Sequence, residues 1–352
     1  MTTGMLQIFT SYSGVSRNSG KTLKHWIPAY AGMTVYLVSS LFSSPSNAQS
    51  KDSWPTRPIR LVHGFISGGS VDITARLIAA HLSESLGQQV IVDGRPGAGG
   101  TTGASIVAKS DADGYTLFLM ASGHATSPGL YRALPYDPVK DFAMISMVAS
   151  NPMVVLSNPT FPAKTMPELV QRAKAAPGQI NYGSGGIGSG MHLAAELMLA
   201  ELHVRMQHVP YKGGTAAQTA LLSGEIPVFF TTPAGTAELH RAGKLRILGV
   251  TTLERFPSLP EVPTVAESLL PGFNARGWMA LAAPKGTPDA VLARLNAAIH
   301  TAAARRDVQE RLVNLGTVVE DTLTPQAAQK FLADEVVRWK GVVQAAGIPL
   351  QD

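Results

Sequence analysis

The chain has 352 residues, of which 29 are basic and 24 acidic, and it contains no cysteine. The lack of cysteine excludes disulfide-stapled scaffolds, iron–sulfur clusters, zinc fingers and cysteine nucleophiles. A hydrophobic content of 45% excludes a largely disordered chain. A chain of this length favours roughly two domains over one small core.

The first 48 residues differ in composition from the rest. They contain three basic residues and no acidic one, then an apolar stretch at 33–42 and a small-residue site that ends at Ala48. These are the parts of a secretory signal, and the apolar stretch is shorter than the roughly 20 residues that a membrane span needs. We therefore expect residues 1–48 to be a signal peptide; a disordered cytoplasmic tail and an uncleaved anchor are the alternatives.

The charge that remains without this leader is nearly balanced. Removing its three basic residues leaves 26 basic against 24 acidic side chains, a formal charge of about +2. A nucleic-acid-binding surface needs clustered basic residues, so we expect no nucleic acid partner.

From Ile59 onward, short apolar strands alternate with helices. This order and spacing predict βαβ units and a mainly parallel sheet. The predicted strands are 59–65, 90–92 and 116–121, and the predicted helices are 72–86 and one that follows the glycine-rich loop 97–103 and ends at 108.

The second half repeats this order and predicts a second α/β lobe of about 100 residues. Its predicted strands are 179–182, 207–211, 226–230 and 245–250, and its helices are 167–176, 189–202, 215–223 and a short one ending at 241. The tail adds a strand at 277–282 and helices at 288–304, 307–315 and 325–346, which we expect to cover the first lobe.

Two extended stretches, Ile145–Leu156 and Leu245–Thr251, flank the second lobe. A chain that leaves one lobe and later returns makes two crossings, which is the architecture of a hinge. The predicted division is lobe I, formed by 49–148 plus 252–352, and lobe II, formed by 149–251.

Two strand–loop–helix junctions, at 63–72 and 182–192, are the strongest candidates for a ligand site. Each is rich in glycine and serine, follows a strand and opens a helix. Unpaired backbone N–H groups and the helix dipole make such a junction favourable for an anion. Two junctions in two lobes could face each other across a cleft; the alternative is that both are ordinary turns.

Other chemistry finds little support. The second loop contains Gly183-x-Gly185-x-x-Gly188, but the next strand ends in Tyr211-Lys212 and not in the acid that a dinucleotide ribose requires. We find no Gly-x-Ser-x-Gly elbow and no metal-ligand spacing among the nine histidines. We therefore expect no cofactor, no metal and no catalytic residue.

Three further residues, Asp72, His124 and Thr231, are candidates for the ligand site. Asp72 stands in the first turn of a helix, where it either caps the helix or accepts a hydrogen bond from a ligand. His124 and Thr231 each follow a strand, which places both at the strand-end rim with the two loops. Each is a candidate for the cleft, against the alternative of a structural role.

With these residues in view, the chain resembles the Bug-type extracytoplasmic solute receptors of tripartite tricarboxylate transporters. The resemblance runs from about Trp54 to Pro349. Short segments in a characteristic order carry it: 54–60 (WPTRPIR), 67–72 (SGGSVD), 94–100 (GRPGAGG), 113–116 (DGYT), 134–138 (LPYDP), 209–213 (VPYKG) and 259–264 (LPEVPT).

The resemblance implies an α/β, two-lobed periplasmic-binding-protein fold of type II-like, Venus-flytrap form, with two hinge crossings. It also implies a periplasmic, monomeric receptor that takes a small carboxylate and delivers it to the membrane permease subunits of a tripartite transporter. In the family, backbone amides, hydroxyls and waters at the two loops hold the carboxylate. Carried over by position, the ligand-binding residues are Phe65, Ser67, Gly68, Gly69, Asp72, Ser184, Gly188 and Ser189, beside His124 and Thr231.

This chain departs from the family at several positions. The family usually has Val-Pro-Phe where this chain has His63-Gly64-Phe65, and often Thr where Val71 stands. An Asp often follows the strand that ends in Phe229-Phe230, whereas Thr231-Thr232 follow it here. Because an acid would pair with an amino group, we expect a plain carboxylate ligand and not an amino acid.

Two other functions remain possible at this stage. A periplasmic sensor would use the same cleft and pass its signal to a two-component kinase. An α/β hydrolase or dinucleotide enzyme would show turnover, and the missing motifs argue against it.

Overall fold

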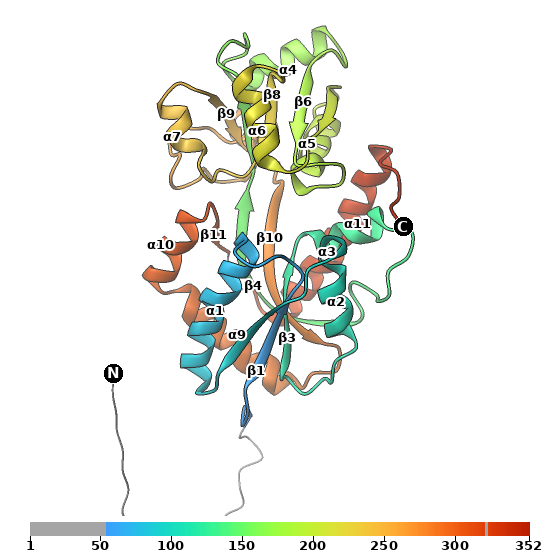
Figure 1. The fold of residues 1–352 in the computed structure, drawn as a ribbon, viewed down its shortest axis with the longest axis vertical. Coiled ribbons are helices and arrows are strands. Elements are labelled where there is room, and N and C mark those ends of the chain that lie inside the picture. The colour runs from blue at the N-terminus through green and yellow to red at the C-terminus, as the bar shows by residue number, and fades with distance from the viewer. Residues whose placement is uncertain (1–53, 321–322) are drawn as a thin grey trace, which may run out of the picture. The chain divides into compact units, whose positions relative to one another are not determined.

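The computed structural model describes residues 54–320 and 323–352, so the predicted signal peptide lies outside the described residues. Asp52–Asp352 form one compact unit. Its described part contains a six-stranded and a five-stranded sheet, and Figure 1 shows them one above the other along the long axis.

The first sheet has the strand order β11-β4-β10-β3-β1-β2. β1 pairs in parallel with β2 and β3, as predicted, but β10 is antiparallel to both β3 and β4. The sheet is therefore mixed and not mainly parallel, because β4 and β10 connect to the second lobe and not to a crossover helix. Its strands are β1 (Ile59–His63), β2 (Val90–Gly94), β3 (Thr116–Ala121), β4 (Phe142–Pro152), β10 (Arg276–Pro284) and β11 (Val318–Val319).

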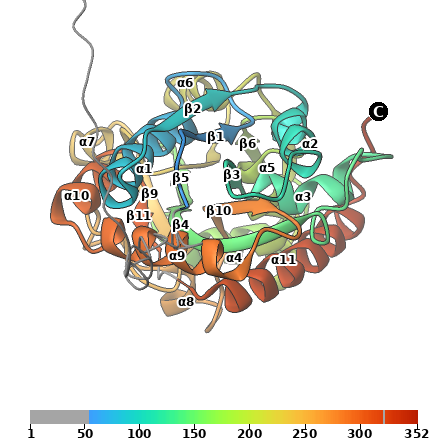
Figure 2. The same ribbon diagram turned by 90° about the horizontal axis from the view of Figure 1, so that it is seen from below.

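Helices cover both faces of the first sheet. Alternate strand residues such as Leu117 and Leu119 pack against α1, α9 and α10, while Phe118 and Met120 face α2, α3 and α11. This follows from the two-residue period of a strand and produces three layers. Figure 2 shows α11 along the side of the first sheet, next to α3. These helices are α1 (Ser70–Leu86), α2 (Thr101–Ala108, after the 3-10 turn Ala98–Gly100), α3 (Gly123–Leu130), α9 (Asp289–Ala303), α10 (Arg306–Asn314) and α11 (Pro325–Ala345).

The second sheet has the order β7-β6-β8-β5-β9, with β6 parallel to β7 and β8 and with β5 antiparallel to β8 and β9. Helices cover both of its faces too, as its buried clusters show. Its elements are β5 (Val154–Ser157), α4 (Met166–Ala175), β6 (Asn181–Ser184), α5 (Gly190–Glu201), β7 (Gln207–Pro210), α6 (Gly214–Ser223), β8 (Val228–Thr231), α7 (Thr236–Arg241) and β9 (Arg246–Val250).

The two crossings between the sheets lie next to each other. β4 ends at Pro152, which pairs with the first residue of β10, Arg276. The Thr251 hydroxyl accepts a hydrogen bond from Met153 N (3.0 Å) and donates one to the Ala275 carbonyl oxygen (2.5 Å). One side chain thus ties the outgoing strand to the returning one.

The return crossing lies at residues 275–276, later than the predicted stretch Leu245–Thr251. β9 remains in the second sheet, and Phe256, Leu259 and Val262 pack in the same buried cluster as its strands. Residues 252–275, which include the short helix α8 (Val265–Ser268), were assigned to lobe I from the sequence. These residues carry no strong strand pattern. The sequence therefore indicated where β9 ends, but not that the chain continues around the second lobe before it returns.

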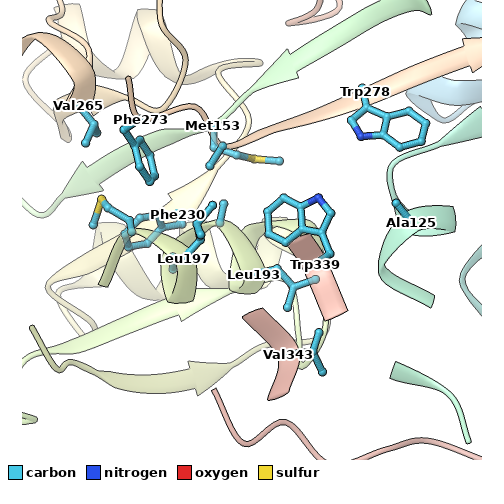
Figure 3. Close-up of a cluster of buried hydrophobic side chains, with 14 of the residues drawn as sticks. Ala125, Met153, Leu193, Leu197, Phe230, Val265, Phe273, Trp278, Trp339 and Val343 are labelled. Atoms are coloured by element: carbon cyan, nitrogen blue, oxygen red, sulfur yellow. The ribbon is translucent and has the colours of Figure 1, made fainter. Parts of the chain in front are cut away.

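One buried cluster extends through both lobes. Figure 3 shows Met153, Leu193 and Leu197 of the second lobe gathered with Trp278 and Trp339 of the first. α11 also contacts α5. The tail helices therefore cover the first lobe, as predicted, and α11 packs in addition against the second.

Candidate ligand-binding cleft

A cleft of about 450 Å³ lies between the two lobes. Both predicted loops reach it, and so do the crossing strands β4 and β10. Its lining residues on the first lobe are Phe65, Ser70, Val71, Gly99, Ala121, Ser122, Gly123, Thr126, Ser127, Leu130, Tyr131, Asn151, Gly277, Trp278, Met279 and Gln351; on the second they are Met153, Ile187, Gly188, Ser189, Gly190 and Thr232.

Three of the described helices begin at this cleft. Ser70 opens α1, Gly123 opens α3 and Gly190 opens α5, and all three residues line the cavity. The first N–H groups of a helix lack partners within the helix, and the helix dipole places partial positive charge there. The cleft therefore offers positive potential from two lobes without a cationic side chain.

The described residues that line the cleft are uncharged. Among the described residues that line the cleft, none is Asp, Glu, His, Lys or Arg. Hydroxyl and amide groups supply its polar atoms, and Phe65, Tyr131 and Trp278 supply aromatic surface. Such a site can hold an anion with an apolar body, but it has no acid to neutralise a buried cation.

The first loop contributes fewer ligand-facing residues than the sequence predicted. Phe65 lines the cleft, whereas Ser67 and Gly68 are exposed and Gly69, the N-cap of α1, is partly exposed outside the lining. Ser70 occupies the rim in their place. The predicted loop thus reaches the cleft through Phe65 and Ser70, while Ser67, Gly68 and Gly69 lie outside the lining.

Asp72 lies behind the loop. Its carboxylate is buried and accepts hydrogen bonds from Gly68 N (3.0 Å) and Arg76 Nε (2.9 Å), while Oδ1 lies 3.1 Å from His63 Nε2. The Arg76 guanidinium, with the Gly68 amide, outweighs burial and lowers the pKa of Asp72 to about 2. The helix-end role is thus the one the contacts describe, and Asp72 does not line the cleft.

The second loop is similar. Gly188 and Ser189 line the cleft, and Ser189 caps α5 by accepting a hydrogen bond from His192 N (3.2 Å). Ser184 is fully buried, and its hydroxyl lies 2.6 Å from His208 Nε2. Ser184 therefore shapes the loop from beneath.

His124 is buried on α3 and does not line the cleft. Its ring stacks on Tyr136, and its Nε2 lies 2.8 Å from the Pro138 carbonyl oxygen, so Nε2 carries the proton. Burial, only partly offset by this hydrogen bond, lowers the pKa of His124 to about 4. These contacts describe a structural role for His124, which was the alternative to a place in the cleft.

The depressed pKa of His124 predicts a loss of stability in acid. As the pH falls from about 6.5 to 4, the unfolded chain takes up this proton before the folded chain does, so the free energy of unfolding decreases. His124→Gln can still donate to Pro138 and should lose less stability than the wild type between pH 7 and pH 5. Urea denaturation at both pH values measures this, and equal losses in the two proteins would contradict it.

Thr231 ends β8 and is 8% exposed, and the residue at the cleft is its neighbour Thr232. Successive strand residues point to opposite faces, so a shift of one position decides which one the ligand meets. The structure thus places Thr232, and not the predicted Thr231, at the cleft.

Sequence reasoning missed a group of polar residues at the cleft. Ser122, Thr126 and Ser127 belong to the N-cap and body of α3, which was not predicted as a helix. Asn151 lies at the end of β4, and Gln351 is held beside Leu130 by backbone hydrogen bonds. Only the Ser122-Gly123 step after a predicted strand could have pointed to this region.

Membrane-spanning helices and metal-binding clusters are both absent from the part of the chain that the structure describes. None of its helices is long and apolar enough to cross a bilayer. No group of three or more His, Asp or Glu side chains within it is arranged to hold a metal ion.

Comparison with solved structures shows the fold. The periplasmic binding protein BugD is 33% identical, with a TM-score of 0.67 over 85% of this chain and 100% of that chain. Rpa4515 of R. palustris, solved with adipate, is 34% identical, with a TM-score of 0.69 over 85% and 100%. MatC of Rhodopseudomonas palustris, solved with malate, is 33% identical, with a TM-score of 0.66 over 82% and 100%.

The α/β two-lobed fold expected from the sequence is therefore confirmed. Residues 74–348 match the family described as the tripartite tricarboxylate transporter family receptor. This match spans most of the chain and agrees with the resemblance found in its short motifs. The chain belongs to the receptor family of the tripartite tricarboxylate transporters.

Proposed function

We propose that this protein is a periplasmic solute receptor that binds a small carboxylate without an ammonium group and delivers it to a tripartite transporter. The carrying observation is the cleft, where three helix N-termini meet and no described lining residue is ionised. Backbone N–H groups and hydroxyls would hold a carboxylate there. Of the residues expected from the sequence, Phe65, Gly188 and Ser189 would contact it.

The related receptors support this class of ligand. Adipate and malate are bound by Rpa4515 and MatC, and both molecules carry two carboxylates and no amino group. In this chain the aromatic surface of Phe65, Tyr131 and Trp278 would contact the body of such a ligand.

The remaining parts of the proposal follow the family. The leader at 1–48 would direct export, the lobes would close around the crossings at 152–154 and 275–276, and the membrane permease subunits would receive the ligand. The protein would act as a monomer. It would not catalyse a reaction, because a receptor releases its ligand unchanged.

Calorimetric titration tests the ligand class. We expect malate or adipate to bind at least about 10-fold more tightly than aspartate or glutamate, because an ammonium group in this cleft would lose water without gaining an anionic partner. Tighter binding of either amino acid would overturn the proposal.

Thr232→Asp provides a sharper version of this test, because it places an acid in the cleft. We expect this variant to bind malate more weakly and aspartate more tightly than the wild type. Thr219→Asp, an equal charge change on the exposed side of α6, is the matched control and should alter neither affinity.

A further inference from the structure

A buried imidazole stands behind each of the two loops that reach the cleft. His63 ends β1 and is fully buried, and His192 lies in the first turn of α5 and is 5% exposed. Neither ring lines the cleft. Both make the same kind of contact with the loop in front of them.

In the first lobe, Phe65 N donates to His63 Nδ1 (3.4 Å), and His63 Nε2 lies 3.1 Å from Asp72 Oδ1. Asp72 in turn accepts from Gly68 N (3.0 Å). Imidazole and carboxylate together therefore hold two backbone amides of the loop that carries Phe65.

In the second lobe, Gly188 N donates to His192 Nδ1 (3.1 Å), and His192 Nε2 lies 3.7 Å from Glu196 Oε1. Glu196 also accepts a hydrogen bond from the Tyr182 hydroxyl. Gly188 lines the cleft, so this imidazole directly orients a residue at the ligand site.

The two contacts determine the protonation of the rings. An imidazole nitrogen that accepts a hydrogen bond from an amide must be unprotonated, so in both rings the proton is on Nε2 and points toward the carboxylate. A second proton would go to Nδ1, where it would meet an N–H donor. The loop could then keep its position only by losing that hydrogen bond.

We propose that His63 and His192 are positioning residues that hold the two ligand-facing loops in their binding geometry, and that protonation of either ring weakens ligand binding. This inference rests on the proposed function of the cleft and adds a pH-dependent element to it. The duplication in two lobes is what distinguishes it from an isolated buried histidine.

Charged groups lie close to both rings. On α1, the Asp72 carboxylate lies 3.1 Å from His63 Nε2 and also binds the Arg76 guanidinium, and the ring lies close to Gly94 of β2. The first-lobe ring therefore lies beside an anion that a neighbouring cation partly neutralises.

His192 has a richer environment. Besides Glu196 and Tyr182, the His208 ring stacks on it at 3.7 Å between centroids. Burial, and after it the charge of His192, lowers the pKa of His208 to about 4. Both rings line a second groove of about 890 Å³, which also contains Glu201, Arg205 and Arg338 and gives solvent a path to them.

Asparagine and leucine variants separate positioning from packing. His63→Asn and His192→Asn keep an acceptor near the Nδ1 position but cannot be protonated, whereas the leucine variants remove the acceptor. With adipate and malate as probes, we expect the wild-type Kd to rise at least about 10-fold from pH 8 to pH 5.5. The Kd of the asparagine variants should rise less than about 3-fold over the same range. The leucine variants should bind about 10-fold more weakly than the wild type at pH 8.

His240→Asn is the matched control. His240 Nδ1 also lies within hydrogen-bond distance of a backbone amide, Ile247 N at 3.4 Å, but in α7 outside the cleft lining. This variant should retain the wild-type pH dependence. Asparagine variants of His63 and His192 that follow the wild-type pH dependence, or leucine variants with wild-type affinity, would overturn the inference.

Nitrogen-15 NMR of the ligand-free protein decides the same question without a ligand. We expect both rings to show an unprotonated Nδ1 at pH 8, and the Phe65 and Gly188 amide resonances to shift as the rings titrate. An Nδ1-protonated form at pH 8 would refute the inference, and so would Phe65 and Gly188 amide resonances that do not shift as the pH is lowered. A wild type that binds neither probe would instead count against the proposed function, and NMR would still decide the role of the histidines.

Discussion

Replacing Glu335 by leucine should lower the free energy of unfolding by about 4 kcal/mol. Glu335 Oε2 accepts hydrogen bonds from the indole N–H of Trp278 (2.9 Å) and of Trp339 (2.7 Å), and all three residues are buried. Leucine would leave both donors without a partner. Each such donor costs about 1–3 kcal/mol, and the nearby Arg338 would lose its carboxylate 3.4 Å away.

These three residues lie where the C-terminal helix meets a strand that connects the two lobes. Trp278 belongs to β10, the returning crossing strand, and lines the cleft, while Trp339 belongs to α11. The Glu335 carboxylate therefore ties the C-terminal helix to the strand that connects the lobes. Figure 3 shows both tryptophans within the buried cluster that the lobes share.

Urea denaturation of the wild type and of two variants measures this effect. Glu335→Gln retains one oxygen that can accept from both indoles, so it should cost only about 1–2 kcal/mol. A leucine variant within 1 kcal/mol of the wild type would show that the indole groups find other partners.

The sequence was sufficient to predict the alternation of strands and helices and the location of the two loops. Strand–loop–helix junctions carry strong local signals, because a glycine-rich turn and an apolar strand depend on neighbouring residues alone. The same local signals do not show in which direction each side chain of the loop points. Ser184 was predicted to contact a ligand, and Asp72 either to contact one or to cap its helix; in the structure each hydrogen-bonds to a histidine behind its loop.

The helix α3 shows what local reasoning could not find. Its eight residues include two glycines, a threonine and Pro128 within the helix, which is a composition that disfavours helix in isolation. Six of the eight are buried, and the helix packs against α11, nearly 200 residues later in the chain. Tertiary contact stabilises it, and with it the third helix N-terminus of the cleft.

Changing Gly64 to alanine should destabilise the protein by about 3 kcal/mol and displace Phe65 from the cleft. A Cβ atom at this position would lie 2.4 Å from Gly100 Cα and 2.5 Å from the Gly100 carbonyl oxygen. Both atoms belong to the backbone, so no side-chain rotation relieves the overlap. The turn at 98–100 would have to move away from the loop.

This movement would reach the ligand site. Phe65 follows Gly64 directly and lines the cleft, and its ring lies next to Gly100. Because a displaced Phe65 no longer completes the cleft, the affinity for a carboxylate ligand should fall at least about 10-fold together with stability.

Gly341→Ala is the matched control for the same chemical change. Gly341 lies in the interior of α11, and an added Cβ there meets no atom within 4 Å. Alanine favours a helix over glycine by about 0.5–1 kcal/mol, so this variant should be slightly more stable than the wild type. Thermal unfolding and calorimetric titration of both variants test the argument. A Gly64→Ala variant with wild-type stability would mean that the loops in front of β1 are not packed backbone to backbone as described.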